Sequence, residues 1–179
     1  VHVKGFNNTS IDQILNEGGI GKGHFFYYFK NKEELGYAIL ESQSNSTAER
    51  IWDPAFRADL DPLSRIYRLL DNVIKIYRQR GCTGGCPIGS MAMEMSDIHE
   101  GFRRKAEAIF RSWTGRVRES LLEGVKTSQL RGDVNVDEVA EFVVASIQGA
   151  ILLCVTRRDL SVMRRCFRSL KRYLESLRA

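Results

Sequence analysis

The sequence predicts an all-α protein in which an N-terminal helix-turn-helix precedes a larger helical bundle. Apolar residues recur every three or four positions along most of the chain, which is the period of a helix with one buried face. Only three prolines occur in 179 residues, and few stretches alternate apolar and polar residues as a half-buried strand would. Hydrophobic residues make up 43% of the chain, which is enough for the core of a globular helical protein.

The first predicted helix begins after Thr9 or Ser10. Ser10 can cap its N-terminus, and Gln13 stands three residues later, as a capping box requires. Its apolar face is formed by Ile11, Ile14 and Leu15. Two adjacent glycines, Gly18 and Gly19, then supply the backbone freedom of a sharp turn.

A second predicted helix runs from about Gly21 to Phe29. Phe25 and Phe29 share its inner face, and Ile20 is expected to fill the gap between the two helices. Residues 24–29 are all aromatic or histidine, which is more than one face of a helix can bury. The outer face is therefore expected to present side chains to a partner: Lys22, Gly23, His24, Tyr27 and Tyr28, with Phe26 at its edge.

The chemistry of this outer face suits a DNA groove. Lysine ammonium groups neutralise phosphates, a histidine can bond a base edge, and tyrosine hydroxyls reach phosphate oxygens. Gly23 lets the backbone approach a surface closely. Between Gly18 and Lys32 there are three lysines and no acidic residue, so the positive charge is local. The alternative is an amphipathic helical hairpin whose aromatic residues belong only to a core.

The residues GF-x-x-TSI-x-x-I, starting at Gly5, and GI-x-KG-x-FF-x-YFKNKEEL, starting at Gly19, resemble the tetracycline-repressor (TetR) family of transcriptional regulators. The resemblance is close from Gly5 to about Leu40 and extends over the rest of the chain by helical pattern and length. It implies a homodimeric, all-helical repressor that binds a pseudo-palindromic operator in double-stranded DNA and whose C-terminal domain binds a small-molecule inducer. Matched to the family's positions, the DNA contacts fall on Thr9, Lys22, Gly23, His24, Tyr27, Tyr28 and Lys32. The family's core positions match Phe25 and Phe29.

The resemblance also implies a division into two domains. Residues 1–48 are expected to form the helix-turn-helix domain, and residues 49–179 the ligand-binding and dimerisation domain. Members of the family usually carry a full first helix of about fifteen more residues, whereas only Val1–Phe6 precede the first turn here. We therefore expect the chain to be incomplete at its N-terminus.

The next segments are predicted to link the two domains. A long helix is expected from Lys32 into the forties, followed by a connection over 53–61 with prolines at its two ends. Residues 63–80 then have helical periodicity, and the glycine-rich stretch 81–85 breaks the chain.

Two further predicted helices carry the candidate effector site. One begins at Cys86, with Pro87 in its first turn, and the other covers 99–127. Methionine pairs are often ordinary core residues, but their flexible thioethers also line sites for varied apolar ligands. The candidate ligand-binding residues are Met91, Met95, Phe110, Trp113 and Phe142.

Residues 136–155 are apolar on two faces, so this helix must be buried on two sides. One face can pack within its own domain and the other against a second subunit, with the last helix completing a four-helix interface. Small residues permit a close approach of helices, namely Ser146, Gly149 and Ala150. The sequence therefore predicts a homodimer.

The positive charge of the chain is concentrated in its last segment. Residues 157–179 contain eight basic and two acidic residues, a net +6, so the remaining residues sum to −1 within the total of +5. Apolar residues at steps of three and four predict an amphipathic helix: Met163, Phe167, Leu170, Leu174 and Leu177. Its basic face is either simply solvated or makes a secondary contact with a polyanion.

Cys82 and Cys86 lie in the sequence GCTGGCPIG between two predicted helices. No metal site is expected, because the three histidines, His2, His24 and His99, form no paired ligand motif with them. No catalytic site or cofactor is expected either, since neither an acidic partner nor an oxyanion motif accompanies a cysteine–histidine pair.

Cys86 is the candidate regulatory residue. It stands at the predicted start of a helix, where the helix dipole favours the thiolate and thus reaction with electrophiles or oxidants. The segment GC-P-I-G-x-x-A-x-E resembles a branch of the family with a cysteine at this place, some members of which sense electrophiles such as N-ethylmaleimide, quinones or unsaturated acids. A buried structural cysteine is the alternative interpretation.

The remaining composition limits the function classes. No run of about eighteen apolar residues predicts a membrane span, and four scattered cysteines do not resemble a secreted disulfide scaffold. We therefore expect a cytoplasmic, ligand-responsive DNA-binding regulator that is not an enzyme and does not contact a membrane. The alternative is a helical small-molecule-binding protein or enzyme without DNA binding.

Overall fold

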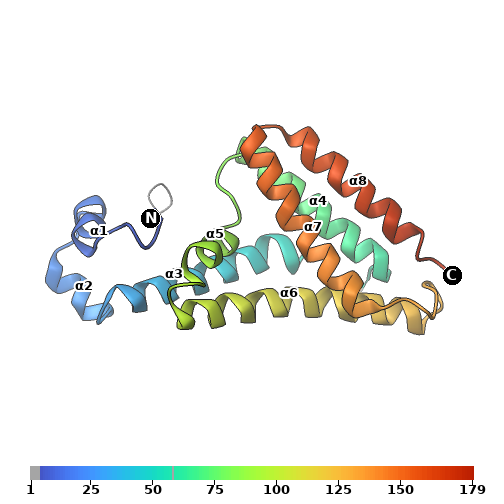
Figure 1. The fold of residues 1–179 in the computed structure, drawn as a ribbon, viewed down its shortest axis with the longest axis horizontal. Coiled ribbons are helices and arrows are strands. Elements are labelled where there is room, and N and C mark those ends of the chain that lie inside the picture. Colours follow the sequence, from blue (N-terminus) through green and yellow to red (C-terminus); the bar gives the residue numbers. More distant parts are fainter. Residues whose placement is uncertain (1–4, 58) are drawn as a thin grey trace. The chain divides into compact units, whose positions relative to one another are not determined.

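The computed structural model describes residues 5–57 and 59–179, and these residues form an all-α fold, as predicted (Figure 1). The elements are α1 Ile11–Gly18, α2 Lys22–Tyr28, α3 Lys32–Thr47, the π-helical turn η1 Ala48–Trp52, α4 Pro62–Gln79, α5 Pro87–Met95, α6 Glu100–Lys126, α7 Val136–Arg157 and α8 Leu160–Glu175. No strand occurs in the described part of the chain; Leu130 and Arg178 form one isolated antiparallel bridge. Residues 1–4, where the end of a preceding helix was expected, lie outside the described residues.

The chain divides into two compact units. The first contains Val1–Asn45 and Pro87–Ala108, and the second contains Ser46–Cys86 and Ile109–Ala179. The division at 45/46 falls close to the expected domain boundary at 48/49. In addition, α5 and the first turns of α6 group with the N-terminal helices, although they are distant from them in the sequence.

In the first unit, local capping sets the limits of α1. The Ser10 hydroxyl accepts a hydrogen bond from the Gln13 backbone N–H at 3.1 Å, and the Gln13 side chain accepts one from the Ser10 N–H at 2.9 Å. The predicted capping box is therefore confirmed. Gly19 ends the helix in the left-handed conformation, with a φ of 61°, which a residue with a side chain adopts at a cost.

The core of this unit closes around a glycine on α3. Phe6 and Phe102 pack with their ring centroids 5.2 Å apart, and both are buried. Gly36 lies against these rings: a Cβ at this position would lie 2.5 Å from each. The two aromatic rings can meet over α3 only because residue 36 lacks a side chain.

We expect Gly36→Ala to destabilise the protein by about 1–3 kcal/mol, because the added methyl overpacks two rings that are already held in the core. The gain in helix propensity of about 1 kcal/mol offsets only part of this cost. Chemical denaturation measures the change. Gly115→Ala on α6 is the matched control, since nothing lies within 4 Å of a Cβ there; this variant should be neutral or more stable. Equal stability changes for the two variants would contradict the packing argument.

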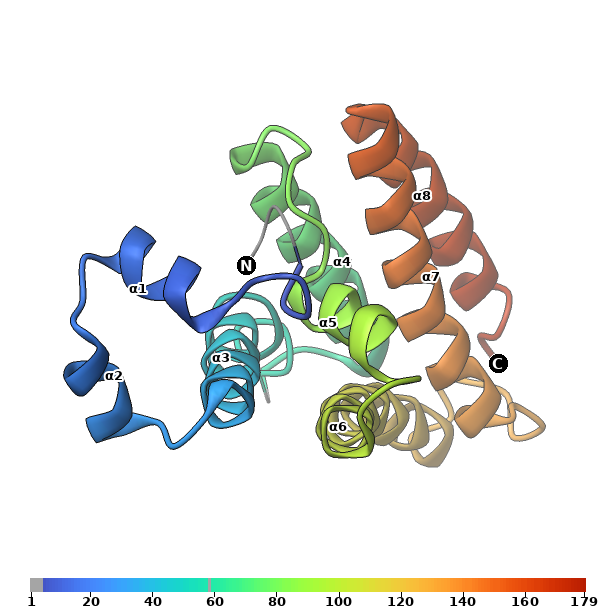
Figure 2. The ribbon, with the colours of Figure 1, turned by 60° about the vertical axis from the view of Figure 1, so that its left-hand side comes forward.

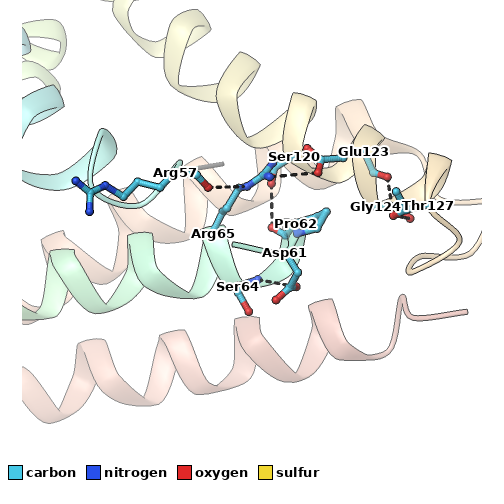
Figure 3. A network of polar contacts seen from close by, with 9 residues as sticks. All are labelled: Arg57, Asp61, Pro62, Ser64, Arg65, Ser120, Glu123, Gly124 and Thr127. Atoms are coloured by element: carbon cyan, nitrogen blue, oxygen red, sulfur yellow. Dashed lines mark hydrogen bonds and ion pairs between the residues drawn. The ribbon is translucent and has the colours of Figure 1, made fainter. Parts of the chain in front are cut away.

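In the second unit, polar contacts join the start of α4 to the last turns of α6 (Figure 3). Asp61 caps α4 through the Ser64 N–H at 3.2 Å, with Pro62 in the first turn. The buried Ser120 hydroxyl donates to the Pro62 carbonyl at 2.9 Å, and the Arg65 guanidinium binds the Glu123 carboxylate, with Nη2–Oε1 at 3.2 Å. These contacts set the position of α4 on α6.

The helices α7 and α8 form an antiparallel pair, seen side by side in Figures 1 and 2, and α4 packs on α8. Arg158 adopts a φ of 51° and Asp159 caps α8 through the Ser161 N–H, so the two helices reverse direction within two residues. The apolar positions predicted for the last helix are all buried: Met163, Phe167, Leu170, Leu174 and Leu177.

The helix α7 is apolar along much of its length. This helix is long and apolar enough to cross a membrane by length and composition, with a mean hydropathy of 2.0 over an 18-residue window. However, eight of its residues are buried within the second unit, as in the core helix of a globular protein: Val139, Ala140, Val143, Val144, Ile147, Ala150, Ile151 and Cys154. Its apolar character is therefore accounted for by packing within the protein and by the exposed face described below.

Candidate nucleic-acid interface and effector site

The outer face of α2 is exposed, as predicted. Tyr27 is 81% exposed and Tyr28 is 63% exposed, whereas Phe25 on the opposite side is 2% exposed. The Tyr28 ring packs against both the His24 ring, at 5.3 Å, and the Tyr27 ring, at 4.9 Å. Lys22 is also exposed and forms no ion pair with the described residues. The result is an exposed cluster of aromatic rings in tilted and edge-on contact, with a lysine at its edge.

The backbone of α2 is accessible at one position on this face. Nothing lies within 4 Å of a Cβ at Gly23, so a partner can come close to the helix there. Two expectations about the inner side were wrong: Ile20 is 38% exposed and does not fill a gap between α1 and α2, and Phe29 is only half-buried. The short connection after Gly19 leaves Ile20 at the surface, so Phe25 carries most of the burial of α2.

Thr9 and Lys32 differ from the other predicted DNA-contact residues, because their polar groups are bound inside the protein. Thr9 is only 6% exposed, and its hydroxyl donates to the Gly5 carbonyl at 2.6 Å. The Lys32 ammonium donates to the Asn7 carbonyl at 2.8 Å and lies 4.8 Å from the centroid of the Phe6 ring. Both side chains hold the turn before α1 rather than extending from the surface.

A residue that the sequence analysis did not name, Glu94 on α5, holds the same turn. Its carboxylate accepts hydrogen bonds from the backbone N–H groups of Phe6, at 2.9 Å, and Asn7, at 2.7 Å. Gly5 has a φ of 80°, and a Cβ there would lie 2.5 Å from the Glu94 carboxylate oxygen. The turn can therefore approach α5 this closely only with glycine at position 5. A lone acid between Met93 and Met95 in an apolar helix was the only sequence signal for this contact.

A second polar link joins α3 to the start of α6. The Tyr37 hydroxyl donates to the Glu33 carboxylate, and His99 Nε2 lies 3.3 Å from the other oxygen of Glu33. The hydrogen bond from Tyr37 lowers the pKa of Glu33, and the same bond raises the pKa of Tyr37 to about 12. The His99 ring packs edge-on against Phe102 at 5.1 Å. This cluster positions α3, the helix that follows the helix-turn-helix, on the start of α6.

Two of the candidate effector residues come together in the second unit. Trp113 is 4% exposed and stacks on Trp52 at 5.3 Å, while Phe110 meets Trp113 edge-on at 5.2 Å. Phe56 stacks on the other side of Trp52 at 5.8 Å, and the Arg116 guanidinium lies 5.0 Å from the Phe56 ring. Trp52 and Phe56 extend this aromatic cluster beyond the residues that the sequence analysis named.

The other three candidates lie in different surroundings. Met91 and Met95 are buried on α5 in the first unit, at 7% and 5% exposure. Phe142 is 50% exposed, and its ring meets Tyr173 of α8 edge-on at 5.3 Å. Phe142 points away from the buried stripe of α7, so the structure places it on the α7–α8 surface and not in the aromatic cluster around Trp113.

The thiols differ in their surroundings. Cys82 and Cys154 are buried, and burial together with a hydrogen bond to Cys82 raises the pKa of Cys154 to about 12. Cys86 is half-buried and directly precedes α5. Burial, and to a smaller extent the electrostatic influence of Cys86, raise the pKa of Tyr77. Among the described residues, no three side chains of the metal-binding types gather at one place.

The exposed surface of the α7–α8 pair is hollowed and apolar. A depression of about 530 Å³ is lined by nine residues, including Phe142, Ser146, Gly149, Leu153 and Tyr173. Leu152 beside it is 66% exposed. This surface contains the small residues that the sequence analysis assigned to an interface between helices.

Comparison with known proteins identifies the family. The model of the tetracyclin repressor-like C-terminal domain matches residues 62–170, and the model of the bacterial regulatory proteins of the tetR family matches residues 2–39. The chain belongs to the TetR family. The match over residues 2–39 includes the exposed face of α2. The match over residues 62–170 includes the aromatic residues of α6 and most of the α7–α8 pair.

Individual TetR-family relatives agree with this assignment. An HTH-type transcriptional regulator from the lacX 3′ region of Lactococcus lactis is 31% identical over 99% of this chain and 88% of its own length. The transcriptional repressor DhaR of a Mycobacterium species is 27% identical over 87% of the chain and 77% of its own length. The crystal structure of a TetR regulatory protein from Rhodobacter sphaeroides superposes with a TM-score of 0.84 at 27% identity, covering 96% of this chain and 90% of the other.

The protein is thus a ligand-responsive, DNA-binding transcriptional regulator of the TetR type. The family assignment, the all-α fold and the N-terminal helix-turn-helix predicted from the sequence are confirmed. The family is one of regulators rather than enzymes.

Proposed function

We propose that this TetR-family protein is a homodimeric repressor that leaves a pseudo-palindromic operator when a small molecule binds or modifies it. The observation that carries this proposal is the exposed face of α2, where the rings of Tyr27 and His24 contact that of Tyr28 and Lys22 is unpaired among the described residues. A soluble regulator gains nothing from exposing these rings unless a partner covers them. We place the protein in the cytoplasm, with residues 1–48 as the DNA-binding domain and residues 49–179 as the domain for ligand binding and dimerisation.

The proposal assigns separate roles to two groups of residues. Lys22, Gly23, His24, Tyr27 and Tyr28 face the major groove, with Gly23 as the point of closest approach. Thr9 and Lys32 act indirectly, because they hold the turn before α1. Selection of binding sites from random duplex DNA tests the whole proposal: a pseudo-palindrome supports a dimeric repressor, and no enrichment by a folded dimer at low salt refutes it.

The two polar residues of the α2 face are expected to respond differently to substitution. Lys22→Ala should weaken binding to all sequences alike and reduce the salt slope by about 1, because a phosphate contact carries no sequence information. His24→Ala should instead relax the preference at one or two base pairs, at a cost of about 1–3 kcal/mol on the best site. Binding titrations at several salt concentrations on the selected site and its single-base variants measure both effects. If His24→Ala lowered the affinity for every DNA sequence equally, His24 would not contact a base.

The proposed trigger is either a ligand at the aromatic cluster of Phe110 and Trp113 or an electrophile at Cys86. The reaction at Cys86 would be an addition to an activated alkene. The thiolate sulfur forms a bond to the β-carbon, the electron pair of the double bond moves to the α-carbon, and that carbon takes up one proton, so no oxidant is needed. Cys86 directly precedes α5, the helix whose Glu94 holds the turn before α1.

Cys86→Ser is expected to bind the operator like the wild type but to lose its response to N-ethylmaleimide. In the wild type, modification should lower operator affinity by about tenfold or more, the usual size of an allosteric coupling. Mass spectrometry of the intact protein reports the adduct, and fluorescence polarisation reports the affinity. Cys166→Ser is the matched control, because Cys166 is also half-buried but lies on α8. A full response in Cys86→Ser would leave Cys86 as a structural residue.

A further inference from the structure

A groove between α4 and α8 is lined by many basic residues that lie outside the proposed DNA-binding face. The groove encloses about 870 Å³, and six basic side chains line it against two acidic ones. The basic residues are Lys75 and Arg78 of α4 with Arg164, Arg168, Lys171 and Arg172 of α8. It accounts for half of the eight basic residues in the strongly charged segment 157–179.

One end of this groove is closed by pairs of side chains that reach across it. The Lys171 ammonium lies 2.9 Å from the Asp71 carboxylate, and the Tyr67 hydroxyl donates to Glu175 at 2.5 Å. The two contacts pair residue 71 with 171 and residue 67 with 175, so α4 and α8 run antiparallel along the groove. One turn further on, this register places Lys75 opposite Arg168, and Arg78 opposite Arg164.

Apart from Asp71 and Glu175, which form these two pairs, the residues lining the groove include no acid, and cations lie on both walls. Within the described residues, no ion pair is formed by Lys75, Arg78, Arg164, Arg168 or Arg172. Three of them recur at every fourth position of α8, where like charges destabilise a helix. Other arginines of the same unit do have acidic partners; Arg65, Arg116 and Arg118 are examples. These uncompensated cations therefore favour an anion that neutralises both walls at once.

We infer that the unpaired cations of this groove bind a compact polyanion, specifically a short chain of phosphates, between Lys75 and Arg78 on one wall and Arg164, Arg168 and Arg172 on the other. The cations on α8 extend over eight residues, or about 12 Å of helix, so several charged groups in a row are needed to meet them. Guanidinium groups bind phosphate oxygens in a bidentate manner. The groove volume falls within the range of small-molecule sites, about 300–1,000 Å³.

The chemistry leaves two sources for such a chain, free inorganic polyphosphate and the triphosphate of a nucleotide. The floor of the groove includes Ile74, which is partly exposed and offers an apolar contact beside the cations. The site is distinct from the apolar depression on α7 and α8, which is lined by other residues of α8 such as Cys166 and Tyr173.

Isothermal titration of the full-length protein with sodium tripolyphosphate and with ATP, at about 150 mM salt, tests the inference. We expect saturable binding of at least one of them, weakened at least tenfold in Arg168→Glu and in Lys75→Glu, one variant from each wall. Arg165→Glu is the matched control and should bind like the wild type, because Arg165 is exposed next to the groove residues but bonds Ser161 at 2.8 Å and does not line the groove. Equal affinities for the two compounds indicate the phosphate chain alone, and a preference for ATP indicates that the nucleoside also contacts the groove.

Three results would overturn the inference: no binding of either compound, binding that Arg168→Glu and Lys75→Glu leave unchanged, or binding that only Lys22→Ala abolishes, which would place the anion on α2. Circular dichroism establishes whether the variants are folded. If Arg168→Glu or Lys75→Glu is unfolded, the double variant Lys75→Gln with Arg164→Gln replaces it, because this variant removes charge without reversing it. Operator binding is measured separately on the same proteins. The outcome for the groove is therefore independent of the proposed repressor function.

Discussion

Glu94→Ala should lower operator affinity by about ten- to a hundredfold while the protein remains folded. The carboxylate of Glu94 accepts the backbone N–H groups of both Phe6 and Asn7, residues that lie 88 and 87 positions away in the sequence. Hydrogen bonds to a charged group contribute about 1.5–3 kcal/mol, and two N–H groups lose their partner when the side chain is removed. The turn before α1 then becomes free to move, and with it the orientation of α1 and α2.

Fluorescence polarisation with the selected operator measures this effect. Met93→Ala is the matched control, because Met93 is the neighbour of Glu94 on α5 and is 86% exposed. Glu94→Gln should fall between the alanine variant and the wild type, since its amide keeps one acceptor oxygen but turns an NH₂ group toward the second N–H. Unchanged operator affinity in a folded Glu94→Ala protein would show that this contact does not position the reading helices.

The Glu94→Ala variant can also be tested for its response to inducer, which would not change if Glu94 had a purely structural role. If α5 transmits the effector signal through Glu94, the Glu94→Ala protein should bind the operator weakly both with and without inducer. The ratio of the two affinities would then fall toward 1, because the coupling free energy is lost with the link. A reduced affinity with an unchanged ratio would show that Glu94 only positions the helix-turn-helix. The effector signal would then be transmitted by α3.

Gly149→Arg should convert the protein to a monomer and abolish high-affinity operator binding. Gly149 lies in the apolar depression of α7 and α8, where nothing is within 4 Å of a Cβ, so the isolated chain accommodates a side chain there. In a dimer formed through this surface, a large charged residue would separate the facing helices and bury an unpaired charge. A pseudo-palindromic operator is bound by the two helix-turn-helix domains of one dimer. A monomer should therefore lose most of its specific affinity for the operator.

Analytical ultracentrifugation and operator titration together measure the effect of Gly149→Arg. The matched control is Gly115→Arg on α6, another helical glycine with nothing within 4 Å of a Cβ. The control should remain a dimer with wild-type melting behaviour. A dimeric Gly149→Arg protein would place the interface on a different surface and leave the depression without a partner.

Features that depend on neighbouring residues were predictable from the sequence. The capping box of Ser10 and Gln13, the left-handed Gly19 and the outward direction of Tyr27 and Tyr28 all follow from the order of residues within one or two helical turns. The helix at Pro87 is of the same kind. Such features need no knowledge of how distant segments pack, because capping and helical periodicity act over a few residues.

Where distant segments meet, the predictions were less accurate. Lys32 was expected at the DNA surface, but its ammonium bonds the Asn7 carbonyl, 25 residues away in the sequence. Phe142 was grouped with Trp113 because both are aromatic and lie in predicted helices, yet Phe142 packs on Tyr173. The register of one helix against another decides which side chains meet, and residue type alone does not specify that register.

The sequence by itself determined the helix-turn-helix, the face of α2 that meets DNA in our proposal and the family to which the chain belongs, because these reside in short, local patterns. Only the tertiary structure decided that Glu94 holds the turn at Phe6 and that Lys75 and Arg78 share a groove with the cations of α8. Both arrangements join residues about 90 positions apart. Their physical cause is the packing of whole helices, which brings together charges and backbone groups that no local pattern relates.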